Sequence, residues 1–324
     1  MELQVKECYK KSVEKAAAEM RSLPGFKFAA VADTHLDNSV SDTAANIAAV
    51  DKRVNFKCLV HLGDFLNGNL SRRYTMSVMH EQTELFRNCI HQKPFFPVQG
   101  NHDGYTDFSS AYSPNMAVDE DWSELIAFTG QYENLCRKLP KPYYYVDFPD
   151  YKIRMIILCT FYYTGFYDGV PYSKVYGTDD AQAAWFENEA LDVKPGFTVM
   201  VFSHDTPFED FENPEKDNPR PNGNRLMEIL KNKAAENGFS VAAWFAGHFH
   251  GDYIGNVNGI NFVLVASETA YVPQLWDMPG GGYYPQRTLN TESEDLWDGI
   301  ALDTNARVLR LIRFGAGKNR EITY

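Results

Sequence analysis

Four consecutive residues, Gly100-Asn101-His102-Asp103, place an amide, an imidazole and a carboxylate side by side directly after the apolar residues 95–98. Burying polar groups costs free energy unless each one is paired or ligated, so such a cluster at the end of a buried strand requires partners. One interpretation is a tight turn with an asparagine in the left-handed region, and the other is a metal site. The tetrapeptide alone does not separate the two.

Four other apolar runs in the chain also end in carboxylate or imidazole side chains, which favours the metal site. Mixed ligation by carboxylates, imidazoles and an amide suits divalent transition metals such as Mn, Fe or Zn, whereas Mg²⁺ and Ca²⁺ prefer oxygen ligands alone. We interpret His61, His80 and His91, which lie elsewhere, as core or surface residues. The candidate residues at the ends of the five runs are Asp33, His35, Asp64, Asn101, His102, His204, His248 and His250.

The elements that must position these side chains alternate between strand and helix over the first hundred residues. Apolar runs predict strands at 26–32, 58–62 and 95–98, and periodic segments predict helices at 41–54 and 76–89. Right-handed crossovers in such a βαβαβ unit bring the carboxyl ends of the strands to one edge of the sheet, where α/β sheets bind ligands. The separate motifs are therefore expected to form one site.

The remainder of the chain is expected to continue as a mixed α/β domain. We predict an N-terminal helix at 5–20, within a segment 1–24 that packs on the core, and a single domain over 25–324. The aromatic segment 104–142 is expected to form a wall over the site, and the Pro/Gly-rich segment 271–297 a lid. Further elements are predicted as strands at 143–148, 152–158, 197–202, 241–246, 299–303 and 308–314, a hairpin at 256–266, and helices at 122–139, 179–191 (with Thr178 as N-cap) and 225–236.

Composition restricts the class of partner. The net charge of −12 over 324 residues argues against a broad phosphate-binding surface for nucleic acid. The five cysteines are odd in number and have no close pair, so we expect reduced thiols. The N-terminus does not have the plan of a signal peptide, and no apolar run reaches the ~20 residues that span a membrane. We expect a cytoplasmic protein that binds no membrane, and its oligomeric state stays open.

In their order along the chain, the polar motifs resemble the five motifs of the calcineurin-like metallophosphoesterases. The bacterial and prophage type is the most similar, because its C-terminal end also resembles Arg313-Phe314-Gly315-Ala316-Gly317. The resemblance extends from about residue 26 to about residue 315, and five ordered motifs are far more specific than one. They are Asp33-Thr34-His35, Gly63-Asp64, Gly100-Asn101-His102-Asp103, Ser203-His204 and Gly247-His248-Phe249-His250.

The resemblance implies a fold, two metals and a reaction. The fold is a four-layer αββα sandwich of two mixed sheets. The metals share a hydroxide that attacks a phosphate mono- or diester, and His102 assists the leaving group. The candidate catalytic residues are His102 and Asp103. The implied ligand sets are Asp33, His35, Asp64 and His250 for one metal, and Asp64, Asn101, His204 and His248 for the other, with Asp64 bridging.

Departures from the family pattern leave questions open. Protein Ser/Thr phosphatases carry Asp and Arg just after the bridging carboxylate, whereas Phe65-Leu66-Asn67-Gly68 stands here, so the partner of His102 is undetermined. Purple acid phosphatases have a metal-binding tyrosine where this chain has Asn67. We expect a small phosphorylated substrate. The alternatives are a nuclease, for which Arg72, Arg73 and Lys141 are too few to make a basic rim, and a scaffold without catalysis, which the complete ligand set disfavours.

Overall fold

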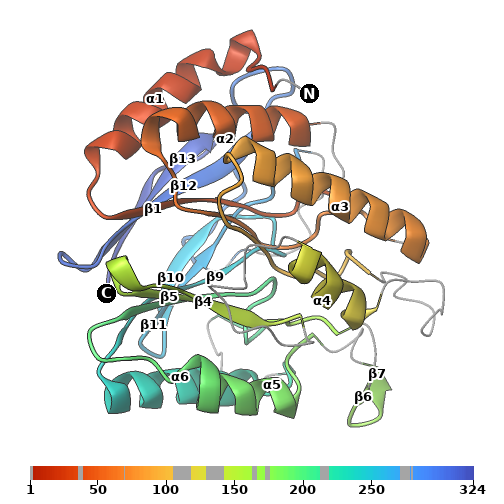
Figure 1. Cartoon of the computed structure of the whole chain (residues 1–324), viewed down its shortest axis with the longest axis vertical. Helices are drawn as coiled ribbons and strands as arrows, with labels where there is room; N and C mark the ends of the chain where they lie inside the picture. The colour runs from red at the N-terminus through yellow and green to blue at the C-terminus, as the bar shows by residue number, and fades with distance from the viewer. Residues whose placement is uncertain are drawn as a thin grey trace.

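The computed structural model describes residues 3–35, 39–68, 70–104, 118–128, 142–162, 166–171, 176–211, 219–270, 278 and 280–324. Two six-stranded sheets pack face to face, and helices cover the outer face of each sheet (Figure 1). Phe28 in the first sheet contacts Phe202 and Phe245 in the second, with ring centroids 6.0 and 6.3 Å apart. The predicted four-layer αββα sandwich is therefore confirmed.

The first sheet has the strand order β14-β13-β12-β1-β2-β3. Strands β1, β2 and β3 are parallel, and β12 pairs with β1 in the antiparallel direction. Strand β14 was not predicted, because its short charged sequence contains no apolar run. The strands are β1 Phe26–Val31, β2 Leu59–His61, β3 Phe95–Pro97, β12 Leu296–Asp303, β13 Val308–Gly315 and β14 Arg320–Thr323.

The second sheet has the order β10-β11-β9-β8-β5-β4. Its central strands β5, β8, β9 and β11 run parallel to one another, and the two edge strands are antiparallel to their neighbours. A small separate hairpin joins β6 Phe166–Tyr167 and β7 Val170–Pro171. The strands of the sheet are β4 Tyr144–Phe148, β5 Ile153–Ile157, β8 Thr198–Phe202, β9 Ser240–Ala246, β10 Tyr253–Val257 and β11 Ile260–Leu264.

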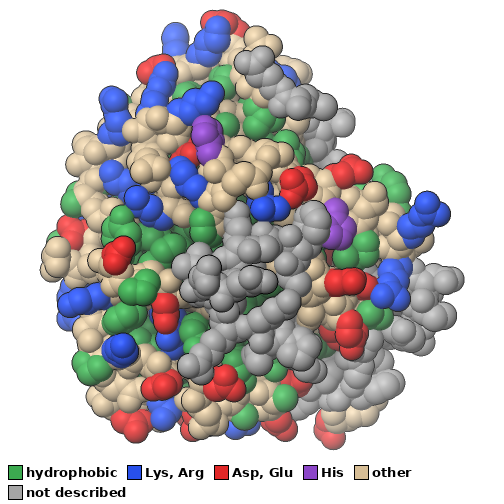
Figure 2. Space-filling model, viewed as in Figure 1, with side chains coloured by type: hydrophobic (Ala, Val, Ile, Leu, Met, Phe, Trp, Pro, Cys, Tyr) green, Lys and Arg blue, Asp and Glu red, His purple; other side chains and the backbone are tan. Residues whose placement is uncertain are grey.

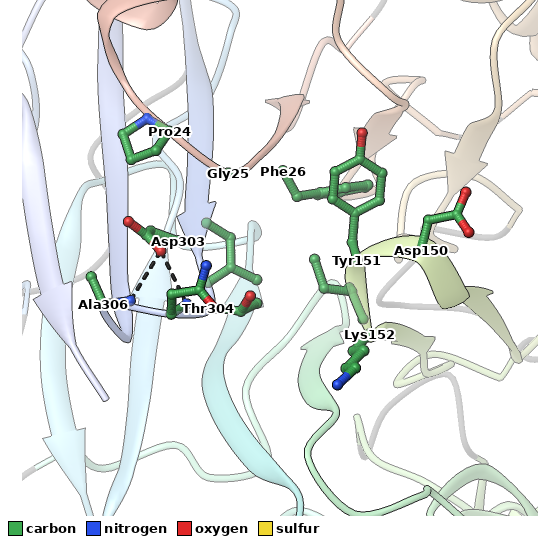
Figure 3. Close-up of a pocket in the computed structure, with 12 residues that line it drawn as sticks. Pro24, Gly25, Phe26, Asp150, Tyr151, Lys152, Asp303, Thr304 and Ala306 are labelled. Atoms are coloured by element: carbon green, nitrogen blue, oxygen red, sulfur yellow. Dashed lines mark hydrogen bonds between the residues drawn. The ribbon is translucent and has the colours of Figure 1, made fainter.

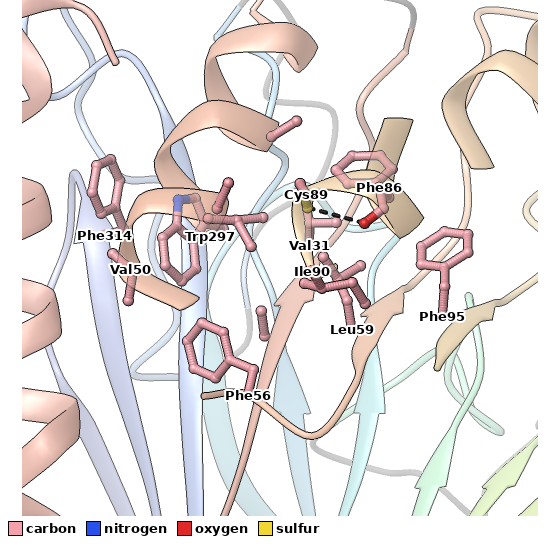
Figure 4. Packing of buried hydrophobic residues seen from close by; sticks show 14 of the residues in the cluster. Val31, Val50, Phe56, Leu59, Phe86, Cys89, Ile90, Phe95, Trp297 and Phe314 are labelled. Carbon is pink, nitrogen blue, oxygen red and sulfur yellow. Dashed lines mark hydrogen bonds between the residues drawn. The ribbon is translucent and has the colours of Figure 1, made fainter. Parts of the chain in front are cut away.

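Helices α1, α2 and α3 lie over the first sheet, and α5 and α6 lie over the second (Figure 1). Apolar residues of α1 belong to the core cluster beneath helices α1, α2 and α3. The same cluster contains Phe56, Phe86 and Trp297 (Figure 4). Parallel strands covered on both faces carry apolar residues at successive positions, as the central strands here do. The helices are η1 Glu7–Tyr9, α1 Lys10–Ser22, α2 Val40–Val54, α3 Arg72–Cys89, α4 Asp119–Phe128, η2 Pro149–Tyr151, α5 Asp180–Trp185, the π-helix η4 Phe186–Ala190 and α6 Gly223–Asn237.

Several predictions differ from the structure or lie outside the described residues. Asp179, rather than Thr178, is the N-cap of α5, because its side chain accepts a hydrogen bond from Gln182 N. The predicted helix 122–139 corresponds to α4, and its residues 129–139 lie outside the described part. The same holds for most of the predicted aromatic wall at 104–142, and for 271–277 and 279 of the predicted lid. Among the described residues, Cys8, Cys58, Cys89 and Cys159 are thiols outside any disulfide.

A buried ion-pair network joins the two sheets near the end of β9. Arg313 of β13 contacts Asp298 of β12 and Asp252, which lies two residues after His250, at 2.9 and 2.7 Å. Arg320 of β14 also pairs with Asp252 at 2.8 Å. Paired charges satisfy one another where single buried charges would be costly. The network therefore holds the loop after β9 against the first sheet.

None of the described helices is long and apolar enough to cross a bilayer.

Candidate metal centre

The structure brings all the predicted ligands to the carboxyl ends of five strands. Strands β1, β2 and β3 of the first sheet end just before Asp33, Asp64 and Asn101, and β8 and β9 of the second sheet end just before His204 and His248. Parallel strands in both sheets open their carboxyl ends toward the same edge of the sandwich. The separate motifs therefore lie together in the structure.

Two groups of ligand atoms converge at this edge. Each group has atoms within 4.8 Å of one another, and Asp64 belongs to both groups. Asn101 joins the second group, because its Oδ1 lies 3.1 Å from both His204 Nε2 and His248 Nδ1. The first group is Asp33, His35, Asp64 and His250, and the second is Asp64, His204 and His248.

The donor set fits metal ions because ligand atoms of several buried side chains converge on the same positions. Asp64 is 1% exposed, and its Oδ2 accepts no hydrogen bond from the described residues, although His204 Nε2 lies 3.1 Å away. His35 Nε2 and His250 Nε2 face each other at 3.4 Å. A buried carboxylate is costly unless positive charge balances it, and a cation supplies such charge.

The backbone at the site is strained. Positive φ is uncommon for residues other than glycine and costs of order 1–3 kcal/mol each, so it persists only where surrounding contacts impose it. Such strain clusters at functional sites. Five candidate ligands adopt it: Asp33 (53°), His35 (46°), Asp64 (55°), His248 (65°) and His250 (58°).

Burial keeps three of the imidazoles neutral. It lowers the pKa of His35 to about 4 and that of His250 to about 3, and it holds the pKa of His248 well below its ordinary value. A neutral imidazole offers the lone pair that a metal requires. At neutral pH these three histidines are therefore ready to act as ligands.

His204 and Asp64 behave as a charged pair. Burial disfavours the charged form of His204, but the carboxylates of Asp64 and Asp33 outweigh it and raise its pKa to about 10. Burial also opposes charge on Asp64, yet the imidazoles of His204 and His102 hold its pKa well below the usual range. The negative charge at the centre is thus balanced by positive charge, which a cation can also supply.

His102 lies beside the two groups and contacts Asp64 through its backbone. Its N–H donates to Asp64 Oδ1 at 2.8 Å, and its ring Nδ1 lies 3.0 Å from the carbonyl oxygen of Asn67. A carbonyl oxygen can only accept a hydrogen bond, so Nδ1 carries a proton. The other ring nitrogen, Nε2, faces the centre and lies 3.9 Å from Asp64 Oδ2. The partner of His102 that the sequence left open is this backbone carbonyl.

Asp103 lies beneath the loop that carries Asp64. It is fully buried, and burial, followed by the charge of Asp64, raises its pKa to about 7. Gly100 allows the close approach of this loop, because a Cβ there would lie 2.3 Å from Asp64 N. The carboxylate of Asp103 accepts backbone hydrogen bonds from Gly100, Asp64, Phe65 and Leu66 at 2.9, 2.9, 2.6 and 3.3 Å.

The sequence did not predict the side chains that border the second group of ligands. The ring of Tyr176 lies 5.5 Å from that of His248, and the guanidinium of Arg220 lies over Tyr176 at 5.0 Å. Arg220 Nε is 2.8 Å from Asp205 Oδ2, beside His204. These residues come from irregular segments whose sequences have no periodicity, so no local signal indicates their position.

Two pockets differ in their relation to the centre. A pocket of about 180 Å³ reaches it at His250 and is lined by residues of 266–270 and 284–287. A larger pocket of about 640 Å³ lies between Gly25 and Tyr151, at the opposite edge of the sandwich beside the β12–β13 turn (Figure 3). Only the smaller pocket belongs to the candidate site.

The charged side chains of one face are shown in Figure 2, which has the viewing direction of Figure 1. Lys, Arg, Asp and Glu are interspersed there, and no continuous basic band crosses the described residues of this face. A duplex-binding surface needs clustered basic side chains that neutralise successive phosphates. This face does not have that property.

Comparisons with known proteins agree with the geometry. The model of the calcineurin-like phosphoesterase family matches residues 26–252. A dimetal phosphatase from Danio rerio has a similar structure, with a TM-score of 0.54 and 14% identity over 93% of this chain and 99% of that chain. GAP50, the anchor in the inner membrane complex of Plasmodium, has a TM-score of 0.50 and 11% identity over 92% and 88%. Among curated proteins no sequence matches this chain.

Proposed function

The chain belongs to the calcineurin-like phosphoesterase family, and from this premise we propose that it is a dinuclear metal-dependent hydrolase of small phosphate mono- or diesters. The observation that carries the proposal is the sharing of Asp64 between two complete groups of buried ligands. A scaffold that no longer bound metals would have no need to retain strained ligands in both groups.

The groups would hold two divalent transition metals, Mn, Fe or Zn. Asp33, His35, Asp64 and His250 would bind one, and Asp64, Asn101, His204 and His248 the other. When bound, such a pair of ions supplies a water activated near neutral pH and positive charge for the phosphoryl oxygens. The mixed donor set argues for transition metals over Mg²⁺ or Ca²⁺.

We propose that His102 protonates or stabilises the departing oxygen of the ester. Its Nδ1 proton is held by the carbonyl of Asn67, so the proton for the leaving group would come from Nε2 of the doubly protonated ring, on the side of the centre, and leave the ring neutral. Its side chain is 26% exposed, which leaves a substrate access to it. For Asp103 we propose a positioning role, because its carboxylate is occupied by backbone N–H groups.

The surroundings of the centre support a small substrate. The pocket of about 180 Å³ beside His250 suits a small molecule. Tyr176 and Arg220, on the other side, add an aromatic ring and a cation that suit the organic part and the charge of a phosphate ester. The net charge of −12 supports a small substrate over nucleic acid.

The test is hydrolysis by metal-stripped protein to which Mn²⁺, Zn²⁺ or Fe²⁺ is added back. The panel contains phosphomonoesters, phosphodiesters and single- and double-stranded DNA. We expect metal-dependent hydrolysis of small esters and no cleavage of DNA.

Two results would contradict this proposal, each in favour of a different function. Salt-sensitive, submicromolar binding and cleavage of DNA would identify a nuclease. Tight binding of two metals without hydrolysis of any ester would favour the scaffold.

A further inference from the structure

We propose that His61, Thr34 and Gln82 form a buried hydrogen-bonded chain that positions the metal-ligand loops after β1 and β2. The inference rests on the proposed function, because it assigns these residues to the support of the metal centre. They are positioning residues, since none belongs to the two groups of ligands. The sequence alone suggested only a core or surface role for His61.

The three side chains are joined in series. His61 Nε2 lies 3.1 Å from the hydroxyl of Thr34, which in turn donates to Gln82 Oε1 at 3.3 Å. The chain continues at each end into the backbone of the loop after β2. Gly63 N donates to His61 Nδ1 at 3.2 Å, and Gln82 Nε2 donates to the carbonyl of Phe65 at 3.0 Å.

The direction of every hydrogen bond in the chain is determined. The backbone N–H of Gly63 can only donate, so His61 Nδ1 accepts and Nε2 carries the ring proton. Nε2 then donates to Thr34, and the single proton of Thr34 goes to Gln82. The amide nitrogen Nε2 of Gln82 donates to the carbonyl oxygen of Phe65. No member can be replaced by an apolar residue without leaving a buried neighbour unpaired.

The chain is closed to solvent. Thr34 and His61 are both 0% exposed, and Gln82 is 6% exposed. The ring of Phe65 stacks on His61 with centroids 3.5 Å apart and an interplanar angle of 16°. Hydrogen bonds in such surroundings are not exchanged for water, so the geometry that they impose is rigid.

The hydrogen-bonded chain can affect metal binding because of the position of Thr34. Thr34 lies between Asp33 and His35, both of which have positive φ. The loop after β2 is also held by Asp103, whereas the Thr34 side chain bonds only to His61 and Gln82 among the described residues. Backbone hydrogen bonds also join the two loops, from Asp33 N to Gly63 O at 3.0 Å and from His35 N to Asp64 O at 3.1 Å. Because Thr34 stands between two ligands, loss of its hydroxyl should still displace Asp33 and His35 more than Asp64, whose loop Asp103 also holds.

The variant that tests this is Thr34→Val, which keeps the shape and removes the hydroxyl. Residues that orient ligands typically change metal affinity by 10–100-fold, so we expect one of the two Mn²⁺ ions to bind about 10–100-fold more weakly and the other as in the parent. Thr34→Ser keeps the hydroxyl and should restore both affinities. Thr198→Val is the matched control, because Thr198 is buried at the start of β8, at the opposite edge.

Mn²⁺ binding is followed by electron paramagnetic resonance, without substrate, together with the melting temperature of each variant. Binding of both ions as in the parent, or equal weakening of both, would overturn the inference while leaving the proposed function intact. If the parent bound no metal, the proposed function and this inference would both fall. Thr34→Ala, which removes the same hydroxyl and leaves Gln82 bonded to Phe65, provides the same test if Thr34→Val does not fold.

Discussion

Asp64→Asn should empty both metal sites and reduce phosphate-ester hydrolysis to the level of metal-stripped protein. Asp64 is the carboxylate common to the two groups, and its Oδ2 accepts no hydrogen bond from the described residues. Asparagine keeps the size of the side chain and an oxygen for the bond from His102 N, but it removes the negative charge that two cations would share. Elemental analysis after saturation with Mn²⁺ and dialysis measures the loss.

Asp51→Asn is the matched control for this experiment. Asp51 is also buried, and it pairs with Lys93 and Phe56 N at the end of α2 that lies away from the centre. The control should retain both metals and full hydrolysis. Two metals in the Asp64→Asn protein, or at most one in the saturated parent, would show that Asp64 does not bridge.

His102→Gln should keep both metals and lose activity mainly toward esters with a poor leaving group. The imidazole presents Nε2 to the centre because the carbonyl of Asn67 holds Nδ1, so the substitution removes a proton donor and no ligand. General acid catalysis is typically worth ~10²–10⁴-fold, and alkyl esters should lose a large part of that range. Nitrophenyl esters, whose leaving group needs no proton, should lose much less.

The comparison requires kcat for both ester classes and the metal content of the variant. His91→Gln, at a half-exposed histidine at the end of α3, is the matched control and should change neither. Equal losses on the two classes would leave His102 as a structural residue that orients Asn101. Loss of metal from the variant would lead to the same conclusion.

Much of the fold and of the candidate site follows from one regularity in the sequence. Asp33, Asp64 and Asn101 each follow an apolar run, which predicts that they lie at the ends of strands. Parallel pairing of β1, β2 and β3 brings those strand ends together. The regularity is informative because burying these groups is costly without a ligand. It needs only short-range sequence information, which is why it is visible without the structure.

What the sequence does not predict depends on contacts between distant residues. Thr34 and Gln82 are separated by 48 positions, and His102 finds its partner in a backbone carbonyl, which has no sequence signature. The left-handed backbone of His248 and His250 is equally hidden, since neither is glycine or asparagine. Tertiary contacts select these conformations against local preference.

The most direct test of the dinuclear account is stepwise addition of Mn²⁺ to metal-stripped protein, with bound metal and ester hydrolysis measured in the same samples. We expect no hydrolysis in stripped protein, a rate that follows the fraction of chains holding two ions, and saturation when both groups of ligands are filled. Full hydrolysis in the stripped protein, or a rate that saturates with one ion per chain, would contradict it.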